Sequence, residues 1–256
     1  MSLELAHRLE GPGDAPLLVL SPSLGTTLRL WEPQLEAVSE RFRVLRHDHP
    51  GHGDSPVPGA AFSVEEEARA LLRLLDGLGV ERFSFCGLSL GGMVGMWLAV
   101  LEPARVETLT LCCTGAKLGS QDDWLARAAL VREQGPGVLV PLQRERWFTA
   151  AFRDSDIARG YLDELGAIPP EGYALCCEAV GAFDFRRELE RIETPTLILA
   201  GAEDPVTPPE VLELLSTGIA RSTTEVVPGA AHLANVEQPE IVGAAVLRHA
   251  WERTAA

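Results

Sequence analysis

The chain has 256 residues, 46% of them hydrophobic, which suits a single α/β domain with a sizeable core. Its 22 lysines and arginines against 37 aspartates and glutamates give a formal net charge of −15, which disfavours nucleic acid and anionic membranes as partners. The first ten residues carry charges and lack the apolar segment of a signal peptide, and the longest apolar run, Met93–Leu101, is too short to span a bilayer, so we expect a cytoplasmic protein.

Short apolar runs alternate with helical patterns in the first half of the chain. Strands are predicted at residues 17–21, 42–47, 82–86 and 106–113, and helices at 31–40, 63–79 and 90–101. The helix at 63–79 opens with a capping box, Ser63 followed by Glu66, and it stops at Gly77 and Gly79. This alternation predicts an α/β fold with a mostly parallel sheet and helices on both faces.

The alternation is interrupted in the middle of the chain. Residues 116–191 show helical patterns without strands. Strands resume at 194–201 and 223–229, with a helix at 208–216 between them and a final helix that begins near Pro239. A helical insertion in an α/β sheet is typical of a lid over an active site. The sequence therefore predicts a core of residues 1–115 and 192–256 with a helical lid of residues 116–191.

Five cysteines are present, at Cys86, Cys112, Cys113, Cys176 and Cys177. An odd count that includes two adjacent pairs is atypical of a disulfide framework. We expect reduced thiols that are mostly buried.

The segment Gly87-Leu88-Ser89-Leu90-Gly91 matches G-x-S-x-G, the nucleophile elbow. It stands between a predicted strand and an apolar helix, which is the context that the motif requires. The motif predicts a strained turn whose glycines avoid collisions with the neighbouring strand and helix. Ser89 would then be exposed above the sheet as a nucleophile, and the Leu90 amide would stabilise an oxyanion at the start of the helix.

A serine nucleophile needs a base and an acid that orients the base. In this motif's fold, the order along the chain is serine, acid, histidine. Asp204 follows the strand at 194–201, and His232 follows the next strand, so both lie at the sheet edge where open α/β folds build sites. Glu203 is the nearest rival acid. Taken singly, Asp204 is also compatible with an ordinary turn residue, and His232 with a capping or surface histidine.

The loop LSPSLGTT, residues 20–27, follows an early strand and is the expected source of a second oxyanion amide. Either Ser23 or Leu24 could supply it, and a plain serine-rich turn is the alternative.

Three histidines, His47, His49 and His52, form H-x-H-x-x-H, which is similar to a metal-binding motif of metallo-hydrolases. Gly51 stands where that motif has aspartate, and no partner cluster of cysteine or aspartate ligands follows. The segment DHPGHGDS is more similar to a loop after an inner strand of α/β-hydrolases. We therefore expect no metal site.

Over nearly its whole length the chain resembles the 3-oxoadipate enol-lactone hydrolases of the α/β-hydrolase superfamily. The similar stretches are LSPSLGTTLRLWEPQ, DHPGHGDS, CGLSLGGMVGMWLA, LCCT, ERWFT, GYALCCEA, PTLILAGAEDPVTPP and PGAAHLANVEQP. Two departures are Pro22, where we expect a polar residue such as asparagine, and Pro50, where many relatives carry arginine. Both concern the pocket entrance and so bear on the substrate rather than on the reaction class.

The resemblance implies an α/β-hydrolase fold and a carboxylic ester hydrolase without a cofactor. It implies that Ser89, His232 and Asp204 open 3-oxoadipate enol-lactone to 3-oxoadipate through an acyl-enzyme, in the β-ketoadipate pathway of aromatic compound catabolism. A protein of net charge −15 then needs a local cation to bind this small anionic lactone. The predicted lid offers Arg127, Arg132, Arg144 and Arg146, with Trp124 and Trp147 as walls.

Arg127 and Arg146 are the first candidates, because each neighbours a lid tryptophan in sequence or by one helical turn. For each arginine the alternative is a solvated helix face, and for each tryptophan a place in the lid core.

Other functions share these features. The same triad serves other small-ester hydrolases, carbon–carbon bond hydrolases and cofactor-free perhydrolases. A different class is a small-molecule receptor built on a hydrolase fold without catalysis, against which the intact Ser89, Asp204 and His232 argue.

Overall fold

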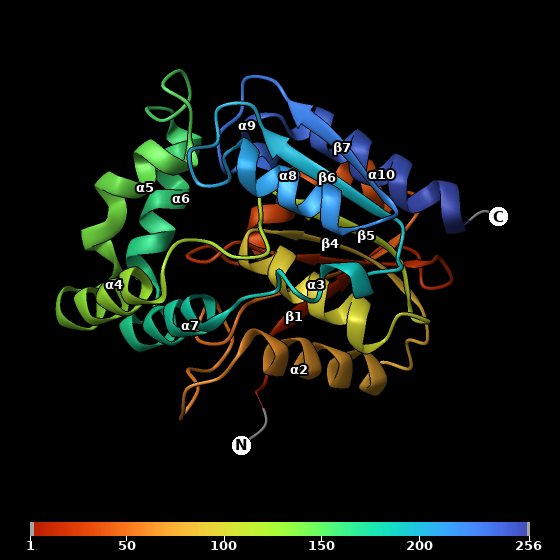
Figure 1. The fold of residues 1–256 in the computed structure, drawn as a ribbon, viewed down its shortest axis with the longest axis horizontal. Coiled ribbons are helices and arrows are strands. Elements are labelled where there is room, and N and C mark those ends of the chain that lie inside the picture. Colours follow the sequence, from red (N-terminus) through yellow and green to blue (C-terminus); the bar gives the residue numbers. More distant parts are fainter. Residues whose placement is uncertain (1–2, 255–256) are drawn as a thin grey trace.

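The computed structural model describes residues 3–254, which form a seven-stranded sheet with the strand order β1-β3-β2-β4-β5-β6-β7 (Figure 1). β1 (His7–Glu10) pairs antiparallel with β3 (Arg43–His47), and every other pair of neighbours is parallel. The other strands are β2 (Leu17–Ser21), β4 (Phe83–Leu88), β5 (Val106–Cys112), β6 (Thr196–Gly201) and β7 (Ser222–Val227). The mostly parallel sheet is confirmed. β1 was not predicted, because three of its four residues are polar and none is fully buried at the sheet edge.

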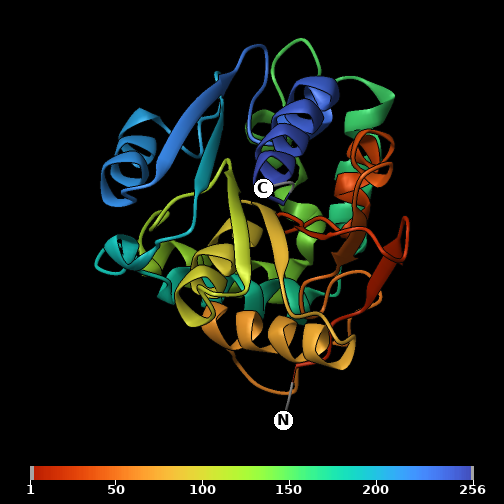
Figure 2. The ribbon, with the colours of Figure 1, turned by 90° about the vertical axis from the view of Figure 1, so that its right-hand side faces the viewer.

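Helices cover both faces of the sheet, as expected. α1 (Leu35–Ser39) and α10 (Pro239–Thr254) pack against each other on one face. The other face carries α2 (Val64–Gly77), α3 (Leu90–Leu101) and α8 (Pro209–Gly218). The layers are visible in the end-on view of Figure 2.

The apolar stripe and the cap of α2 behave as the sequence predicts. The Ser63 hydroxyl accepts the Glu66 amide at 3.2 Å, and the Glu66 carboxylate accepts the Ser63 amide at 2.7 Å. Val64 and Leu71 are buried from the same helix face. A capping box of this kind satisfies two backbone donors that the first helical turn leaves open.

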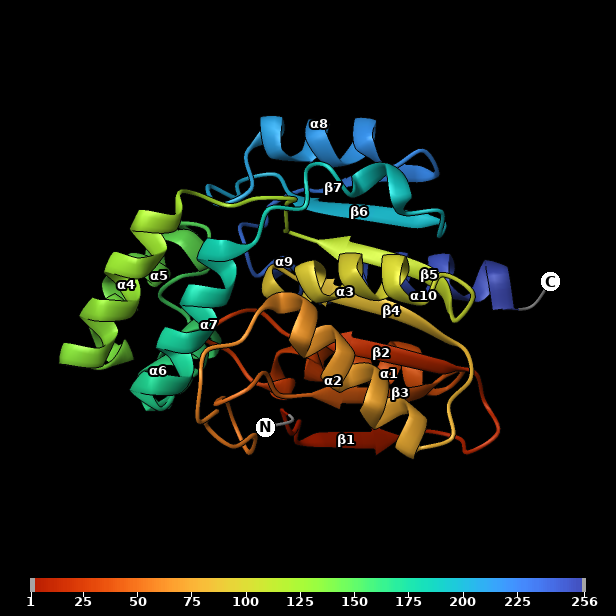
Figure 3. The same cartoon turned by 60° about the horizontal axis from the view of Figure 1, so that its bottom comes forward.

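A helical insertion separates β5 from β6, and no strand occurs within residues 116–191. It consists of α4 (Gln121–Gln134), α5 (Val140–Trp147), α6 (Asp156–Ala167) and α7 (Pro170–Ala182). The arrowheads of β2, β3 and β5 point toward this insertion in Figure 3. The insertion therefore lies beyond the carboxyl ends of the parallel strands, where loops of an open α/β sheet build sites.

Two segments differ in detail from the prediction. The helix expected at 31–40 begins as a 3₁₀ helix, Leu28–Gln34, and continues into the short α1. Pro33 has no N–H to donate within that turn, which favours the tighter, shorter form. A four-residue helix, α9 (Ala234–Glu237), was not predicted, because so short an element leaves no periodic pattern.

All five cysteines are free and buried, as expected. Within residues 3–254, no helix is both long enough and apolar enough to cross a membrane.

Candidate active site

Ser89 lies at the junction of β4 and α3 with φ 56° and ψ −113°, a backbone conformation that is unfavourable for any residue with a side chain. Neighbouring groups hold this conformation on both sides. The Ser89 amide donates to the Cys112 carbonyl at 2.9 Å, and the Thr114 hydroxyl donates to the Ser89 carbonyl at 2.7 Å. The strained turn that the motif predicts is therefore present.

The glycines of this turn are required by close backbone contacts. A Cβ atom on Gly87 would lie 2.2 Å from the Gly91 backbone, and one on Gly91 would lie 2.4 Å from the Ser21 carbonyl oxygen. Real Cβ atoms do not approach a backbone so closely. The collisions with helix and strand expected from the sequence are thus real, and only glycine allows α3 to start so near β2.

His232 and Asp204 are joined by a hydrogen bond between Nδ1 and Oδ2, 2.9 Å long, and both side chains are buried. The Asp204 carboxylate also accepts the Val206 amide at 2.7 Å and the Thr207 hydroxyl. Burial alone would raise the pKa of Asp204, but the contacts with His232, Thr207 and Val206 hold that pKa below its ordinary value. Glu203 is exposed, so the geometry favours Asp204 as the acid.

The loop that carries His232 is fastened on both sides. The Ala231 amide donates to Glu237 Oε2 at 2.7 Å, and the Leu233 amide donates to the Trp147 carbonyl at 3.0 Å. The second oxygen of Glu237 accepts the amide and the hydroxyl of Thr149. Glu237 was not predicted, because its burial is evident only in the structure. These bonds connect the helical insertion to the candidate base.

Leu90 and Leu24 both line the cavity that contains Ser89. Among residues 3–254, no hydrogen bond is found for the Leu90 or the Leu24 amide. Ser23, the alternative to Leu24, donates its amide to the Thr26 hydroxyl at 3.2 Å. The structure therefore favours Leu24 over Ser23 as the second oxyanion donor, beside Leu90.

Most of the residues predicted for the site line one small cavity, which has a volume of about 50 Å³. Nine of the residues predicted for the site line it: Ser23, Leu24, Ser89, Leu90, Trp124, Arg127, Arg146, Trp147 and His232. The sequence did not single out five further lining residues: Met93, Leu118, Gln143, Val180 and Val206. The size of this cavity favours a small substrate.

The four candidate arginines fall into two groups. Arg132 binds Glu171 and Glu178, and Arg144 binds Glu145 and Asp154. Neither lines the cavity, so the alternative of a place on the helix surface holds for these two: acidic neighbours on the insertion bind them outside the cavity.

Arg127 and Arg146 do line the cavity, and neither forms an ion pair within residues 3–254. Arg127 lies over the ring of Trp124, 4.9 Å from its centroid. Partial burial and the charge of Arg127 lower the pKa of Arg146 from its ordinary value. Two like charges beside one cavity, with no acidic partner, form a site that favours an anion.

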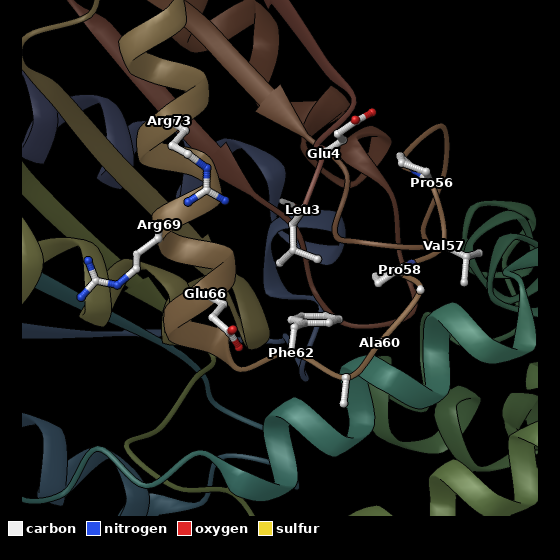
Figure 4. Close-up of a pocket in the computed structure, with 12 residues that line it drawn as sticks. Leu3, Glu4, Pro56, Val57, Pro58, Ala60, Phe62, Glu66, Arg69 and Arg73 are labelled. Atoms are coloured by element: carbon white, nitrogen blue, oxygen red, sulfur yellow. The ribbon is translucent and has the colours of Figure 1, made fainter. Parts of the chain in front are cut away.

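A larger groove of about 690 Å³ lies elsewhere (Figure 4). Leu3, the segment 56–62 and the α2 side chains Arg69 and Arg73 line it. It shares no lining residue with the Ser89 cavity and has no serine, cysteine or histidine in its wall. Volume alone is therefore a poor guide to the chemistry of this protein.

All three clustered histidines are buried, and two of them hold neighbouring segments of the fold together. His49 binds Glu67 and the Pro22 carbonyl, and His52 binds the Pro50 carbonyl and the Gly25 amide. Burial lowers the pKa of His47 to about 3. The ring nitrogens of His49 and His52 are thus engaged by the protein itself.

Comparison with known proteins agrees with this arrangement. Residues 18–245 match the alpha/beta hydrolase family. The chain is 40% identical to 3-oxoadipate enol-lactonase 2 of Acinetobacter baylyi over 92% of this chain and 89% of that protein. It is 33% identical to the putative carbamate hydrolase RutD of Stutzerimonas stutzeri over 99% of this chain and 97% of that protein. The crystal structure of the enol-lactonase from Burkholderia xenovorans LB400 is similar with a TM-score of 0.93 and 37% identity, covering 96% of each chain.

Replacing the candidate nucleophile, Ser89→Ala, should abolish esterase activity and leave the fold intact, because the hydroxyl is not needed to hold the turn. A serine-directed fluorophosphonate should add one label to the wild-type protein and none to the variant, as read by intact mass. Ser216→Ala, at an exposed serine on α8, is the matched control and should be labelled like the wild type. Activity above a few per cent in Ser89→Ala would exclude Ser89 as the nucleophile.

Replacing the acid, Asp204→Asn, should lower kcat by orders of magnitude, because an amide does not hold His232 in the required tautomer or stabilise its charged form. The neighbouring Glu203→Gln is the matched control and should stay near wild type, since Glu203 is exposed. Steady-state kinetics with p-nitrophenyl acetate measure both. The opposite ranking of the two variants would move the acid to Glu203.

Proposed function

This chain belongs to the alpha/beta hydrolase family, and we propose that it is a serine hydrolase that opens 3-oxoadipate enol-lactone to 3-oxoadipate. The observation that carries the substrate class is the pair Arg127 and Arg146, which have no ion pair within residues 3–254 and line the cavity of Ser89 in a protein of net charge −15. The identity to proteins named as enol-lactonases supports the same substrate. The reaction would take place in the cytoplasm, in aromatic compound catabolism by the β-ketoadipate pathway.

The mechanism begins with attack of Ser89 Oγ on the ring carbonyl of the lactone. His232, whose Nδ1 is bound to Asp204, accepts the hydroxyl proton at Nε2. The amides of Leu90 and Leu24 stabilise the oxyanion of the tetrahedral intermediate. Collapse breaks the ring C–O bond, and His232 returns its proton to the enol oxygen that leaves.

The second half of the reaction releases the acid. A water molecule gives its proton to His232 and attacks the acyl-enzyme, and the ester bond to Ser89 breaks as the serine regains a proton. The liberated enol tautomerises to a ketone, which makes closure of the ring unfavourable. No metal or organic cofactor takes part in these steps.

The substrate carries a carboxylate that a neutral ester lacks, and the arginines account for its recognition. A charge-assisted hydrogen bond to a partly buried guanidinium is worth about 1.5–3 kcal/mol. Arg127 is already oriented by Trp124, so little side-chain freedom is lost when it binds an anion.

Residues 116–191 act in this proposal as the lid, over a core of residues 1–115 and 192–256. The lid supplies Trp124, Arg127, Arg146 and Trp147 to the cavity wall. It also excludes water from a site where electrostatic stabilisation must operate in a low dielectric.

The direct test of the substrate is hydrolysis of 3-oxoadipate enol-lactone followed by loss of its ultraviolet absorbance. We expect kcat/KM for this lactone to exceed that for p-nitrophenyl acetate and for a neutral lactone of similar size. A higher kcat/KM for a carbamate, a carbon–carbon bond substrate or perhydrolysis would assign the same machinery to that reaction instead. Absence of any p-nitrophenyl acetate hydrolysis would favour a non-catalytic receptor.

Removing either cavity cation, Arg127→Met or Arg146→Met, should lower kcat/KM for the anionic lactone by about ten- to a hundredfold, since about 1.4 kcal/mol corresponds to a factor of ten. Hydrolysis of p-nitrophenyl acetate should change little, because that ester has no carboxylate. Arg144→Met removes an arginine of the same insertion that is paired outside the cavity, and it should affect neither substrate. Equal losses on both substrates would mean that these arginines support the fold and not anion binding.

A further inference from the structure

A buried histidine–glutamate pair lies behind the loop that carries Leu24. His49, in the loop after β3, and Glu67, on α2, are joined by a contact of 2.5 Å between Nδ1 and Oε1, and neither side chain is exposed. Glu67 occupies a buried position of a helix whose other buried residues are apolar. Its second oxygen finds no hydrogen-bond partner among residues 3–254. Burying a histidine–glutamate pair that leaves one carboxylate oxygen without a partner among these residues is costly, which points to a role beyond packing.

The other ring nitrogen of His49 reaches the loop of residues 20–27, called here the oxyanion loop. Nε2 lies 2.8 Å from the Pro22 carbonyl oxygen. A carbonyl can only accept, so Nε2 must carry a hydrogen whether the shared proton resides on His49 or on Glu67. Burial alone would lower the pKa of His49, but the adjacent Glu67 raises it above its ordinary value. The pair therefore keeps the Nε2 hydrogen of His49 directed at the Pro22 carbonyl oxygen.

The Pro22 carbonyl connects the two halves of the proposed oxyanion hole. It also accepts the Gly91 amide at 3.1 Å, from the first turn of the helix that presents Leu90. Because the peptide unit is planar, fixing the Pro22 oxygen fixes the direction of the Ser23 N–H. That N–H is bound by the Thr26 hydroxyl, and the intervening Leu24 amide is left without an acceptor within residues 3–254.

The same loop after β3 also binds one residue within the oxyanion loop and one residue directly after it. His52 Nε2 accepts the Gly25 amide at 3.2 Å, and Asp48 Oδ1 accepts the Leu28 amide at 2.7 Å. Burial and the nearby His49 lower the pKa of His52 to about 3, which agrees with its neutral, accepting nitrogen. Neither His49 nor Glu67 lines the Ser89 cavity, so both can act only through the loop.

We propose that His49 and Glu67 are positioning residues for the oxyanion hole: their buried pair fixes the Pro22 carbonyl and thereby aligns the Leu24 amide with the Leu90 amide. This inference rests on the serine hydrolase function proposed above. It does not depend on the lactone, because every acyl substrate of Ser89 would form the same oxyanion.

The test replaces both members of the pair, His49→Phe with Glu67→Leu. Apolar residues of similar size avoid leaving an unpaired buried charge, so the variant should fold with a Tm near that of the wild type. With p-nitrophenyl acetate we expect kcat to fall by about ten- to a hundredfold while KM changes by less than about threefold, since loss of a whole oxyanion donor costs about a hundred- to a thousandfold. Binding of a short-chain trifluoromethyl ketone, which forms a tetrahedral adduct, should weaken in parallel, while binding of adipate should not.

Two further variants separate the hydrogen bond from general effects. Glu67→Gln removes the charge but can donate its amide to His49 Nδ1, which leaves the Nε2 hydrogen on Pro22, so kcat should stay within about threefold of wild type. His47→Leu is the matched control, a buried histidine of the same cluster with no bond to the oxyanion loop. It should leave kcat and ketone binding unchanged.

The proposal would be overturned if the folded double variant kept the kcat and the ketone affinity of the wild type. It would also be overturned if Glu67→Gln or His47→Leu lost as much kcat as the double variant. If the double variant does not fold, nitrogen-15 NMR of the unmodified protein decides. Nε2 of His49 should remain protonated from about pH 5 to about pH 9, and its deprotonation within that range would also overturn the proposal. If the wild-type protein hydrolyses esters but not the lactone, all these results still apply. If the proposed hydrolase function is wrong, the wild-type protein itself will lack esterase activity.

Discussion

The close approach of β2 to the first turn of α3 is the constraint on which the rest of the site depends. Gly91 lies so near the Ser21 carbonyl that no side chain fits between them, and its amide binds the Pro22 carbonyl at 3.1 Å. The contact forces the turn at Ser89 into a positive φ and brings the loop after β2 beside the helix terminus. Leu24 and Leu90, more than sixty residues apart, thereby line one small cavity, and neither amide has an acceptor within residues 3–254. The strain at Ser89 is held by bonds from its neighbours and not by the turn alone.

The loop that carries the candidate base, His232, is also held by contacts with residues far away in the chain. His232 sits in a loop whose flanking amides are bound by Glu237 and by the Trp147 carbonyl. Through Thr149 and Trp147, the helical insertion is attached to the loop of the base and does not merely lie over it. In the proposed function, movement of the insertion would therefore be felt at His232. The wall of the cavity and the position of the base belong to one connected structure.

Most arginines on the surface of the insertion are paired with carboxylates, whereas the two that line the cavity have no such partner within residues 3–254. The excess of acidic residues neutralises most arginines of the insertion, as Arg132 and Arg144 illustrate with their two carboxylate partners each. Arg127 and Arg146 escape this pairing and face the cavity. A protein with a net charge of −15 can in this way keep a local positive field where an anionic substrate would bind. The field acts over a short distance, so placement of two side chains matters more than the total charge.

The sequence by itself determined the features that depend on near neighbours in the chain. The turn at Ser89, the cap at Ser63 and the alternation that produces the sheet all follow from local patterns, and the order of Ser89, Asp204 and His232 pointed to their meeting at one edge. The tertiary structure alone decided which of Ser23 and Leu24 keeps a free amide, which arginines face the cavity, and that His49 joins Glu67 behind Pro22. Each of these outcomes depends on a contact between residues far apart in the chain, such as Gly25 with His52 or Arg132 with Glu171. A local sequence pattern does not identify such partners, because packing of the fold determines which distant residues meet, and spacing along the chain does not.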